Sequence, residues 1–193
     1  MEGDRYLPAI RPLLSEKRFL HSLEVAKQAA RLAENYGCSV ERAYTAGILH
    51  DCMKDTNGEE QLQIIEKSGI IFGNMDRAIP KVWHAKAAAA YARDILGVED
   101  AEILAAIACH TTGKAGMSLF EKVLFLADYT SAERDYPGAD EMRRLAEEDL
   151  NGAMYRALAF SITDLAERAK LVHPDTLFAY NEVIAEEITN QQA

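Results

Sequence analysis

Apolar residues recur every three or four positions along almost the whole chain of 193 residues. This spacing places them on one side of an α-helix, whereas the alternation typical of a half-buried strand is nearly absent. Glycines stand where several of these helices should end, and Ser39 is suited to cap a helix start. The pattern predicts an all-α fold with helices at about 16–36, 40–53, 58–68, 75–79, 84–96, 100–110, 117–132, 139–169 and 174–189.

Ligand-type side chains interrupt the apolar sides of these predicted helices. His21 shares its side with Val25, and His50 follows the small residue Gly47. Buried polar groups are costly unless something pairs with them. The other members of the pattern are Asp51, directly after His50, and His84, His110 and Asp128 on three further helices.

Taken singly, each of these residues has an ordinary interpretation. A histidine on an apolar face is more often a hydrogen-bonded core residue, and Asp51 could pair with Lys54 on the helix surface. Taken together, four imidazoles and two carboxylates that point inward are difficult to satisfy one by one. Two divalent cations would satisfy them, and such ligands suit Fe, Mn, Zn or Ni. Since neighbours on a helix diverge by about 100°, His50 and Asp51 would flank a cavity, with Asp51 bridging two metals.

Composition narrows the possible partners. Acidic residues number 31 against 21 lysines and arginines, a formal charge of −10. This balance argues against long nucleic acids, whose binding depends on basic groups, although a few local cations or a metal could still hold a small phosphorylated ligand. Three cysteines without a CxxC pair favour a reduced, cytoplasmic setting. No signal peptide or membrane span is evident, so we expect no membrane partner.

The ligand-type residues lie in stretches that together resemble a known family. These are "KRFLHSLEVA" (17–26), "GILHDCMKD" (47–55), "VWHAKAAA" (82–89), "CHTTGKAGMSLFEKVLFLADY" (109–129), "ERDYPG" (133–138), "RRLAEEDLNGA" (143–153) and "PDTLFAYN" (174–181). The chain resembles the HD-domain superfamily of metal-dependent phosphohydrolases. More narrowly, it resembles the YqeK family of symmetrical bis(5'-nucleosyl)-tetraphosphatases.

The resemblance runs through nearly the whole chain. It implies a single helical HD domain over residues 1–193, with a metal-binding core at about 16–132 and C-terminal helices, the last of them long, at about 139–189. One tripeptide differs: where family members carry Ile-Glu-Pro after "ADY", this chain has Thr130-Ser131-Ala132.

The resemblance also implies a reaction, the hydrolysis of diadenosine tetraphosphate to two ADP. Two cations would polarise phosphoryl oxygens and lower the pKa of a bridging water, so that hydroxide attacks an inner phosphorus. Asp51 and Lys54 would be the catalytic side chains. YqeK-like proteins are associated with iron, and the ligand types equally permit manganese. The first metal would be held by His21, His50, Asp51 and Asp128, and the second by Asp51, His84 and His110.

A tetraphosphate needs cations beyond the metals. Lys54, one turn after His50, could reach a phosphate, or could be an ion-paired surface lysine. Arg134 is a candidate for bidentate phosphate contact, and Arg18 could serve in the same way or remain a solvated charge. Further candidates follow His110, where hydroxyls and backbone N–H groups could hold phosphate oxygens or the segment could simply end a helix. They are Thr111, Thr112, Gly113 and Lys114.

Other functions remain compatible with the same ligands. Another HD phosphohydrolase could act on a different nucleotide, and only the pocket residues or a substrate screen would discriminate. A non-enzymatic di-iron sensor is a second class, but the paired HxxxE, HxxxH or ExxH ligands of di-iron bundles are absent from this sequence. A regulatory domain with a degenerate site is a third, and the complete ligand set argues against it. The sequence leaves the oligomeric state open, a homodimer included.

Overall fold

Helix starts and stops in this protein follow from local side-chain chemistry. The Ser15 hydroxyl accepts a hydrogen bond from the Arg18 N–H and begins α2 (Glu16–Tyr36), which ends at Gly37 in a left-handed conformation, φ +74°. At the start of α8 (Leu119–Thr130), Ser118 and Glu121 cap each other's backbone N–H groups. Such caps satisfy backbone groups that have no partner inside the helix.

The structure, a computed structural model, describes residues 1–192, and the side chains of these except at 187 and 190–192. Within residues 1–192 every regular element is helical and no strand occurs, which confirms the expected all-α class. The remaining elements are η1 (Glu2–Tyr6), α1 (Leu7–Ile10), η2 (Arg11–Leu13), α3 (Val40–Leu49), α4 (Gly58–Ser68), α5 (Asn74–Ala78), η3 (Pro80–Val82), α6 (Trp83–Asp94), α7 (Ala101–Cys109), α9 (Ala139–Glu148), α10 (Leu150–Glu167) and α11 (Pro174–Gln192).

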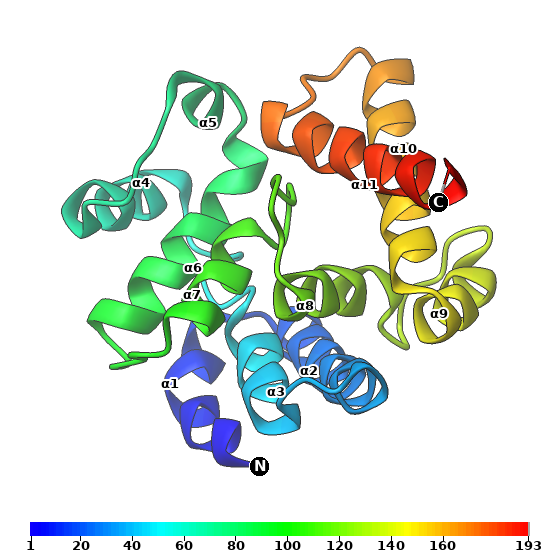
Figure 1. Ribbon diagram of the computed structural model, residues 1–193. Coiled ribbons are helices and arrows are strands. Elements are labelled where there is room, and N and C mark those ends of the chain that lie inside the picture. The colour runs from blue at the N-terminus through cyan, green and yellow to red at the C-terminus, as the bar shows by residue number, and fades with distance from the viewer. Residues whose placement is uncertain (193) are drawn as a thin grey trace.

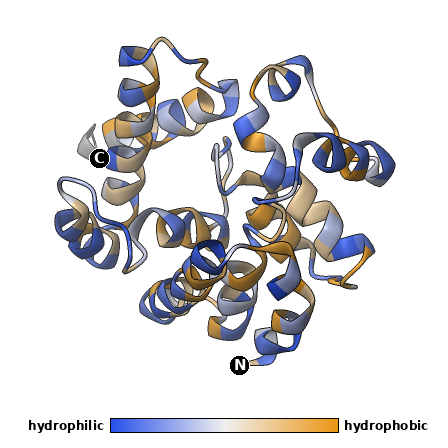
Figure 2. Cartoon of the chain, turned by 180° about the vertical axis from the view of Figure 1, so that it is seen from behind, coloured by the Kyte–Doolittle hydropathy of each residue, from blue (hydrophilic) through white to orange (hydrophobic). Residues whose placement is uncertain are grey.

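Helix α8 occupies a central place in the packing. It contacts α2, α3 and α7 on one side and α9 and α10 on the other, while α11 packs against α10 (Figure 1). Leu32, Ile48 and Leu124 are fully buried where these helices meet. Hydrophobic and hydrophilic residues recur in turn along the helices (Figure 2), as amphipathic helices around a shared core require.

A close approach of two helices prepares the functional site. Gly47 in α3 faces Ala26 in α2, and a Cβ added to Gly47 would lie 2.4 Å from the Cα of Ala26. Only a glycine therefore permits this contact. Because His50 follows Gly47 by one turn, the contact brings the end of α3 against the face of α2 that carries His21.

The structure corrects the predicted helix over 139–169. It consists of two helices, because Asp149 adopts an extended conformation, φ −147° and ψ 96°, between them. The Asp149 carboxylate accepts a hydrogen bond from the N–H of Gly152 at 3.0 Å and caps α10. An aspartate inside an apolar periodic pattern can thus end one helix and begin the next.

Two further differences concern helix ends near the site. The helix predicted over 40–53 stops at Leu49, and the backbone continues through turns in which the N–H of Lys54 donates to the carbonyl of Asp51 at 2.9 Å. The short helices over residues 2–13 were not predicted; they are held by burial of Tyr6 and Ile10. The predicted domain ends at residue 193, outside the described residues. None of the helices described is both long and apolar enough to span a membrane.

Candidate metal centre

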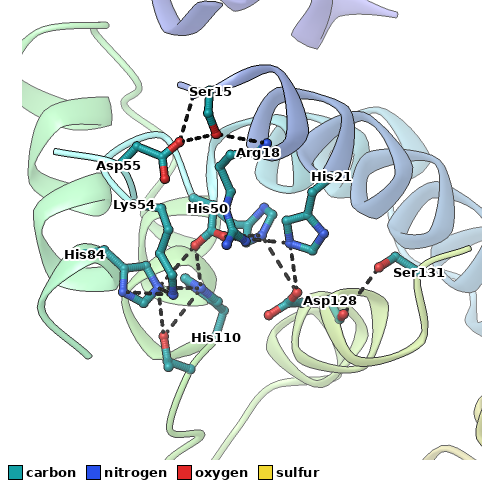
Figure 3. A network of polar contacts seen from close by, with 12 residues as sticks. Ser15, Arg18, His21, His50, Lys54, Asp55, His84, His110, Asp128 and Ser131 are labelled. Carbon is teal, nitrogen blue, oxygen red and sulfur yellow. Dashed lines mark hydrogen bonds and ion pairs between the residues drawn. The ribbon is translucent and has the colours of Figure 1, made fainter. Parts of the chain in front are cut away.

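Six ligand-type side chains from five helices converge in the core. The helices place them at defined points: His21 in the second turn of α2, His50 and Asp51 directly after α3, His84 at the start of α6, His110 directly after α7, and Asp128 in the last turns of α8. The labelled side chains among them point toward one another (Figure 3). The histidine rings form a chain, with centroids 5.3 Å apart for His21 and His50, 4.9 Å for His50 and His110, and 5.3 Å for His110 and His84.

Asp51 lies between two pairs of histidines. Its Oδ2 is 3.7 Å from Nε2 of His21 and 3.6 Å from Nε2 of His50. Its Oδ1 is 3.1 Å from Nε2 of His84 and 3.5 Å from Nε2 of His110. The two carboxylate oxygens therefore divide the four imidazoles into two sets, which is the geometry that a carboxylate bridging two cations requires.

Hydrogen bonds at the far side of the rings orient the imidazoles. Nδ1 of His50 donates to the carbonyl of Gly47 at 2.7 Å, and Nδ1 of His110 donates to the carbonyl of Ile107 at 2.7 Å. Both histidines stand at helix ends, where the last carbonyls have no intrahelical donor. With Nδ1 protonated, the Nε2 lone pair of each ring faces the centre, as a metal ligand must.

The inner atoms of the cluster suit a divalent metal. Among the described side chains, Nε2 of His21, Nε2 of His50 and Oδ1 of Asp51 are buried without a hydrogen-bond partner. Groups of three ligand atoms lie within 4.8 Å of one another, namely His21, His50 and Asp51; His50, His110 and Asp128; and Asp51, His84 and His110. Because these are nitrogen and oxygen donors without thiolates, the residues fit two hydrolytic metal ions.

The electrostatics of the cluster favour neutral rings at His50 and His84 and ionised carboxylates at Asp51 and Asp128. Burial lowers the pKa of His50 to about 4 and that of His84 to about 4, so both rings are neutral at pH 7. Burial alone would raise the pKa of Asp51, but the surrounding imidazoles of His50, His110 and His84 outweigh burial and hold the pKa well below the usual value. These protonation states are the ones that bind metals.

Asp128 completes the centre on the side of α8. Its Oδ1 lies 3.1 Å from Nε2 of His21 and 4.0 Å from Nε2 of His50. Arg134 donates from Nη2 to the same oxygen and from Nε to the Asp128 carbonyl at 2.8 Å. Burial opposes ionisation of Asp128, yet its contact with the His21 ring and the positive charge of Arg134 hold its pKa far below the usual value.

Two further cations reach the cluster. Arg18 in α2 donates from Nη1 to Oδ2 of Asp51 at 2.7 Å, so its guanidinium is not a solvated charge. Nζ of Lys54 lies 3.0 Å from Nε2 of His84, and burial lowers the lysine pKa. With Arg134, these residues place three positive groups beside the carboxylates.

The segment after His110 divides into two parts. Thr111 lies at the cluster, with its hydroxyl 3.4 Å from Nε2 of both His84 and His110. The Thr112 hydroxyl donates instead to the carbonyl of Gly113 at 2.8 Å. Gly113 has a φ of +64°, which marks a left-handed turn. The ammonium of Lys114 pairs with Oε1 of Glu121 at 2.7 Å, so the structure does not bring it to the histidines.

Sequence reasoning missed Glu133. Its Oε1 contacts Nδ1 of His21 and accepts a hydrogen bond from the hydroxyl of Ser131 at 2.8 Å. The available signal was weak: Glu133 stands next to Arg134 in "ERDYPG", within a non-helical segment whose side-chain directions no periodicity predicts. Burial lowers the pKa of His21, but its contacts with the carboxylates of Asp128 and Glu133 outweigh burial and raise the pKa.

The pattern of the HD domain matches residues 18–133 of this chain, a span that includes all six ligand-type residues. The chain belongs to the HD-domain family. This confirms the resemblance noted from the sequence and agrees with the geometry of the histidine–aspartate cluster.

Full-length relatives within the HD-domain family have a shared name. A protein of Bacillus subtilis (strain 168) named symmetrical bis(5'-nucleosyl)-tetraphosphatase is 37% identical over 96% of this chain and 99% of its own length. A protein of the same name from Halalkalibacterium halodurans is 35% identical over 97% of this chain and 100% of its own.

A solved HD-domain structure has the same fold. It is described as a predicted HD superfamily hydrolase involved in NAD metabolism from Clostridium acetobutylicum, and it is 36% identical in sequence. The two structures superpose with a TM-score of 0.92 over 95% of this chain and 97% of the other. The arrangement of helices around the centre is therefore common to both proteins.

Proposed function

We propose that this protein is a metal-dependent hydrolase that cleaves diadenosine tetraphosphate, and related dinucleoside tetraphosphates, symmetrically into two nucleoside diphosphates. The observation that carries the proposal is the division of four histidines between the two oxygens of Asp51. The name of the two full-length relatives supports the choice of substrate and of the bond cleaved.

Asp51 would bridge the two metals. His21, His50 and Asp128 would complete the first metal site, and His84 and His110 the second. When bound, two divalent cations supply Lewis acidity toward phosphoryl oxygens and make a water nucleophilic near neutral pH. Two of the three groups of neighbouring ligand atoms, His21–His50–Asp51 and Asp51–His84–His110, support this division.

The positive side chains around the cluster would bind the phosphates. Arg18, Lys54 and Arg134 reach Asp51, His84 and Asp128 respectively, so a chain of phosphates across the centre would meet a cation at three points. Charge-assisted hydrogen bonds from such groups stabilise negative charge that builds up on transferring and leaving oxygens. These local cations explain how a chain with a net charge of −10 can hold an anionic substrate.

The residues that follow His110 would contribute less to phosphate binding. The Thr111 hydroxyl stands beside the second group of ligands and can contact a phosphate oxygen. Thr112, Gly113 and Lys114 would act on substrate only after leaving their present contacts, because Thr112 bonds to Gly113 and Lys114 to Glu121. We therefore propose Thr111 as the substrate contact of this segment.

Product analysis under anaerobic conditions tests the proposal. The metal-free protein is supplied with ferrous iron or manganese and diadenosine tetraphosphate, and the nucleotides are separated by chromatography. We expect ADP alone; in water enriched in ¹⁸O, one ADP of each pair should carry the label on its terminal phosphate. Formation of AMP and ATP would overturn the cleavage position.

The choice of substrate is tested by assaying a panel of other nucleotides in parallel. Diadenosine triphosphate, deoxynucleoside triphosphates, a cyclic dinucleotide and NAD represent the other phosphoanhydride or phosphodiester substrates that an HD-domain centre could accept. We expect the highest kcat/KM with diadenosine tetraphosphate. A higher value for any other member would replace the proposed substrate, and two bound metals without turnover of any would favour a sensor.

We also propose iron as the resident metal, with manganese as the alternative, and the cytoplasm as the location. The choice of metal rests on the family resemblance and on the donor types, since imidazole and carboxylate suit Fe and Mn alike. The location rests on the three cysteines without a CxxC pair. Metal analysis of protein purified without added metal tests the first proposal. A homodimer and a single domain over residues 1–193 remain predictions, which sedimentation and limited proteolysis would check.

A further inference from the structure

His21 differs from the other oriented histidines in the group that holds its outer nitrogen. Nδ1 of His50 and of His110 each meet a backbone carbonyl of their own helix. His21 stands inside α2, where the carbonyl one turn earlier serves the helix itself. Its Nδ1 instead meets Oε1 of Glu133, which lies 112 positions further along the chain.

Glu133 is itself held in place. The hydroxyl of Ser131 donates to the same Oε1 at 2.8 Å, and Ser131 is completely buried. Ser131 belongs to the tripeptide Thr130-Ser131-Ala132, which stands where members of the family that the chain resembles carry Ile-Glu-Pro. In this structure the tripeptide thus supplies the hydrogen bond that fixes the Glu133 carboxylate at His21.

We propose that Glu133 is a positioning residue that orients His21 and strengthens its Nε2 as a metal ligand, and that Ser131 holds Glu133 for this purpose. A carboxylate at Nδ1 keeps the proton on that nitrogen and directs the lone pair of Nε2 to the centre, where Asp128 and Asp51 lie 3.1 Å and 3.7 Å away. Glu133 touches the outer side of the ring and belongs to none of the groups of inner ligand atoms. Removal of such an outer partner weakens metal binding about 10-fold to 100-fold.

The inference rests on the metal centre of the proposed function, but its test does not need the substrate. Mn²⁺ is titrated into metal-free protein under anaerobic conditions, and the free ion is followed by electron paramagnetic resonance. Wild type, Glu133→Ala, Glu133→Gln and Ser131→Ala are compared. The matched control is Glu34→Gln, which neutralises a carboxylate on the exposed side of the same helix as His21.

We expect the wild type and the control each to bind two Mn²⁺ ions, and each ion should bind the control as tightly as it binds the wild type. Glu133→Ala should weaken one of the two by about 10-fold to 100-fold and leave the other within about twofold. Glu133→Gln should be intermediate, because an amide oxygen still accepts the hydrogen bond but carries no charge. Ser131→Ala should weaken the same ion severalfold. A purely structural role would instead lower the unfolding temperature of the metal-free protein without separating the two affinities.

The inference would be overturned if Glu133→Ala bound both Mn²⁺ ions as tightly as the wild type does. It would also be overturned if the variant lost the same factor in affinity for each ion. If Glu133→Ala does not fold, Ser131→Ala decides: an unchanged affinity rejects the inference. A wild type that binds fewer than two ions would reject the metal centre and this inference together. Selective weakening of one ion in a protein that leaves diadenosine tetraphosphate intact would reject the proposed function alone.

Discussion

Arg18 donates a hydrogen bond to Asp51 at 2.7 Å, so a guanidinium from α2 reaches the carboxylate that divides the four histidines. A group in this place can contact a phosphate that binds beside Asp51. We expect Arg18→Ala to lower kcat/KM for diadenosine tetraphosphate about 10-fold to 100-fold, the effect of one hydrogen bond to a charged group. Steady-state kinetics check this, with Lys17→Ala on the exposed neighbouring position as control. Equal losses in both variants would assign the effect to net charge.

Asp51→Ala should remove the bridging ligand. Because each of its oxygens faces two histidines, both metals should be lost together, and turnover should fall below detection. Metal content by inductively coupled plasma spectrometry, measured with the rate, checks the prediction. Full metal content and full rate in this variant would show that the ligands are assigned wrongly.

Lys54→Ala should separate chemistry from metal binding. The Lys54 ammonium lies 3.0 Å from His84 yet is not a metal ligand, so the variant should keep both ions. We expect kcat/KM to fall about 10-fold to 100-fold, as for loss of a charged hydrogen bond. Lys81→Ala, which changes an exposed lysine, serves as control. Unchanged kcat and KM would remove Lys54 from the phosphate-binding groups.

Gly47→Ala should separate α2 from α3. The new methyl group would lie 2.4 Å from the backbone of Ala26, which cannot move like the end of a flexible side chain. We expect a loss of about 1–3 kcal/mol in unfolding free energy, typical of overpacking. We also expect weaker metal binding, because His50 would move away from His21.

A second glycine offers the matched control for Gly47→Ala. Gly58 is the first residue of α4, and its added Cβ would approach only the Trp83 side chain, at 3.4 Å. Chemical denaturation should show Gly58→Ala close to wild type. A loss in Gly58→Ala equal to that in Gly47→Ala would contradict the packing explanation.

Asp76 should stabilise the fold in a pH-dependent way. Its carboxylate pairs with Lys86 at 2.6 Å, accepts the N–H of Gly73 at 2.8 Å and lies 3.4 Å from Nε2 of His173, just before α11. Burial opposes ionisation of Asp76, but Lys86 and the Gly73 N–H outweigh it and lower the pKa. At pH 7 we expect Asp76→Asn to lose about 1–3 kcal/mol of unfolding free energy.

The sign of this pH dependence follows from the lowered pKa of Asp76. The stabilisation is complete above the unfolded pKa of about 3.9 and disappears as the pH falls through the lower folded value. The difference between wild type and Asp76→Asn, measured by urea denaturation, should therefore shrink from pH 4 to pH 2. Asp94→Asn, at an exposed pair with Arg93, should change little. A constant difference across this range would exclude ionised Asp76 as the cause.

Much of the helical layout could be predicted from local pattern. The predicted ends of α2, at 16–36, and of α4, at 58–68, agree with the structure because a capping side chain and a left-handed glycine fix both ends. Asp149 could not be placed in the same way. Its neighbours continue a helical period, and only the structure assigns its side chain to capping a second helix.

The sequence by itself determined the chemical character of the centre. Inward helix positions carried imidazoles and carboxylates, and periodicity is a local property that a sequence displays directly. The tertiary structure decided which oxygen of Asp51 faces which histidine, that Arg18 reaches Asp51, and that Lys114 pairs with Glu121. It also brought Glu133 to His21 across 112 positions. Such contacts depend on how separate helices and loops pack, and no local period encodes that packing.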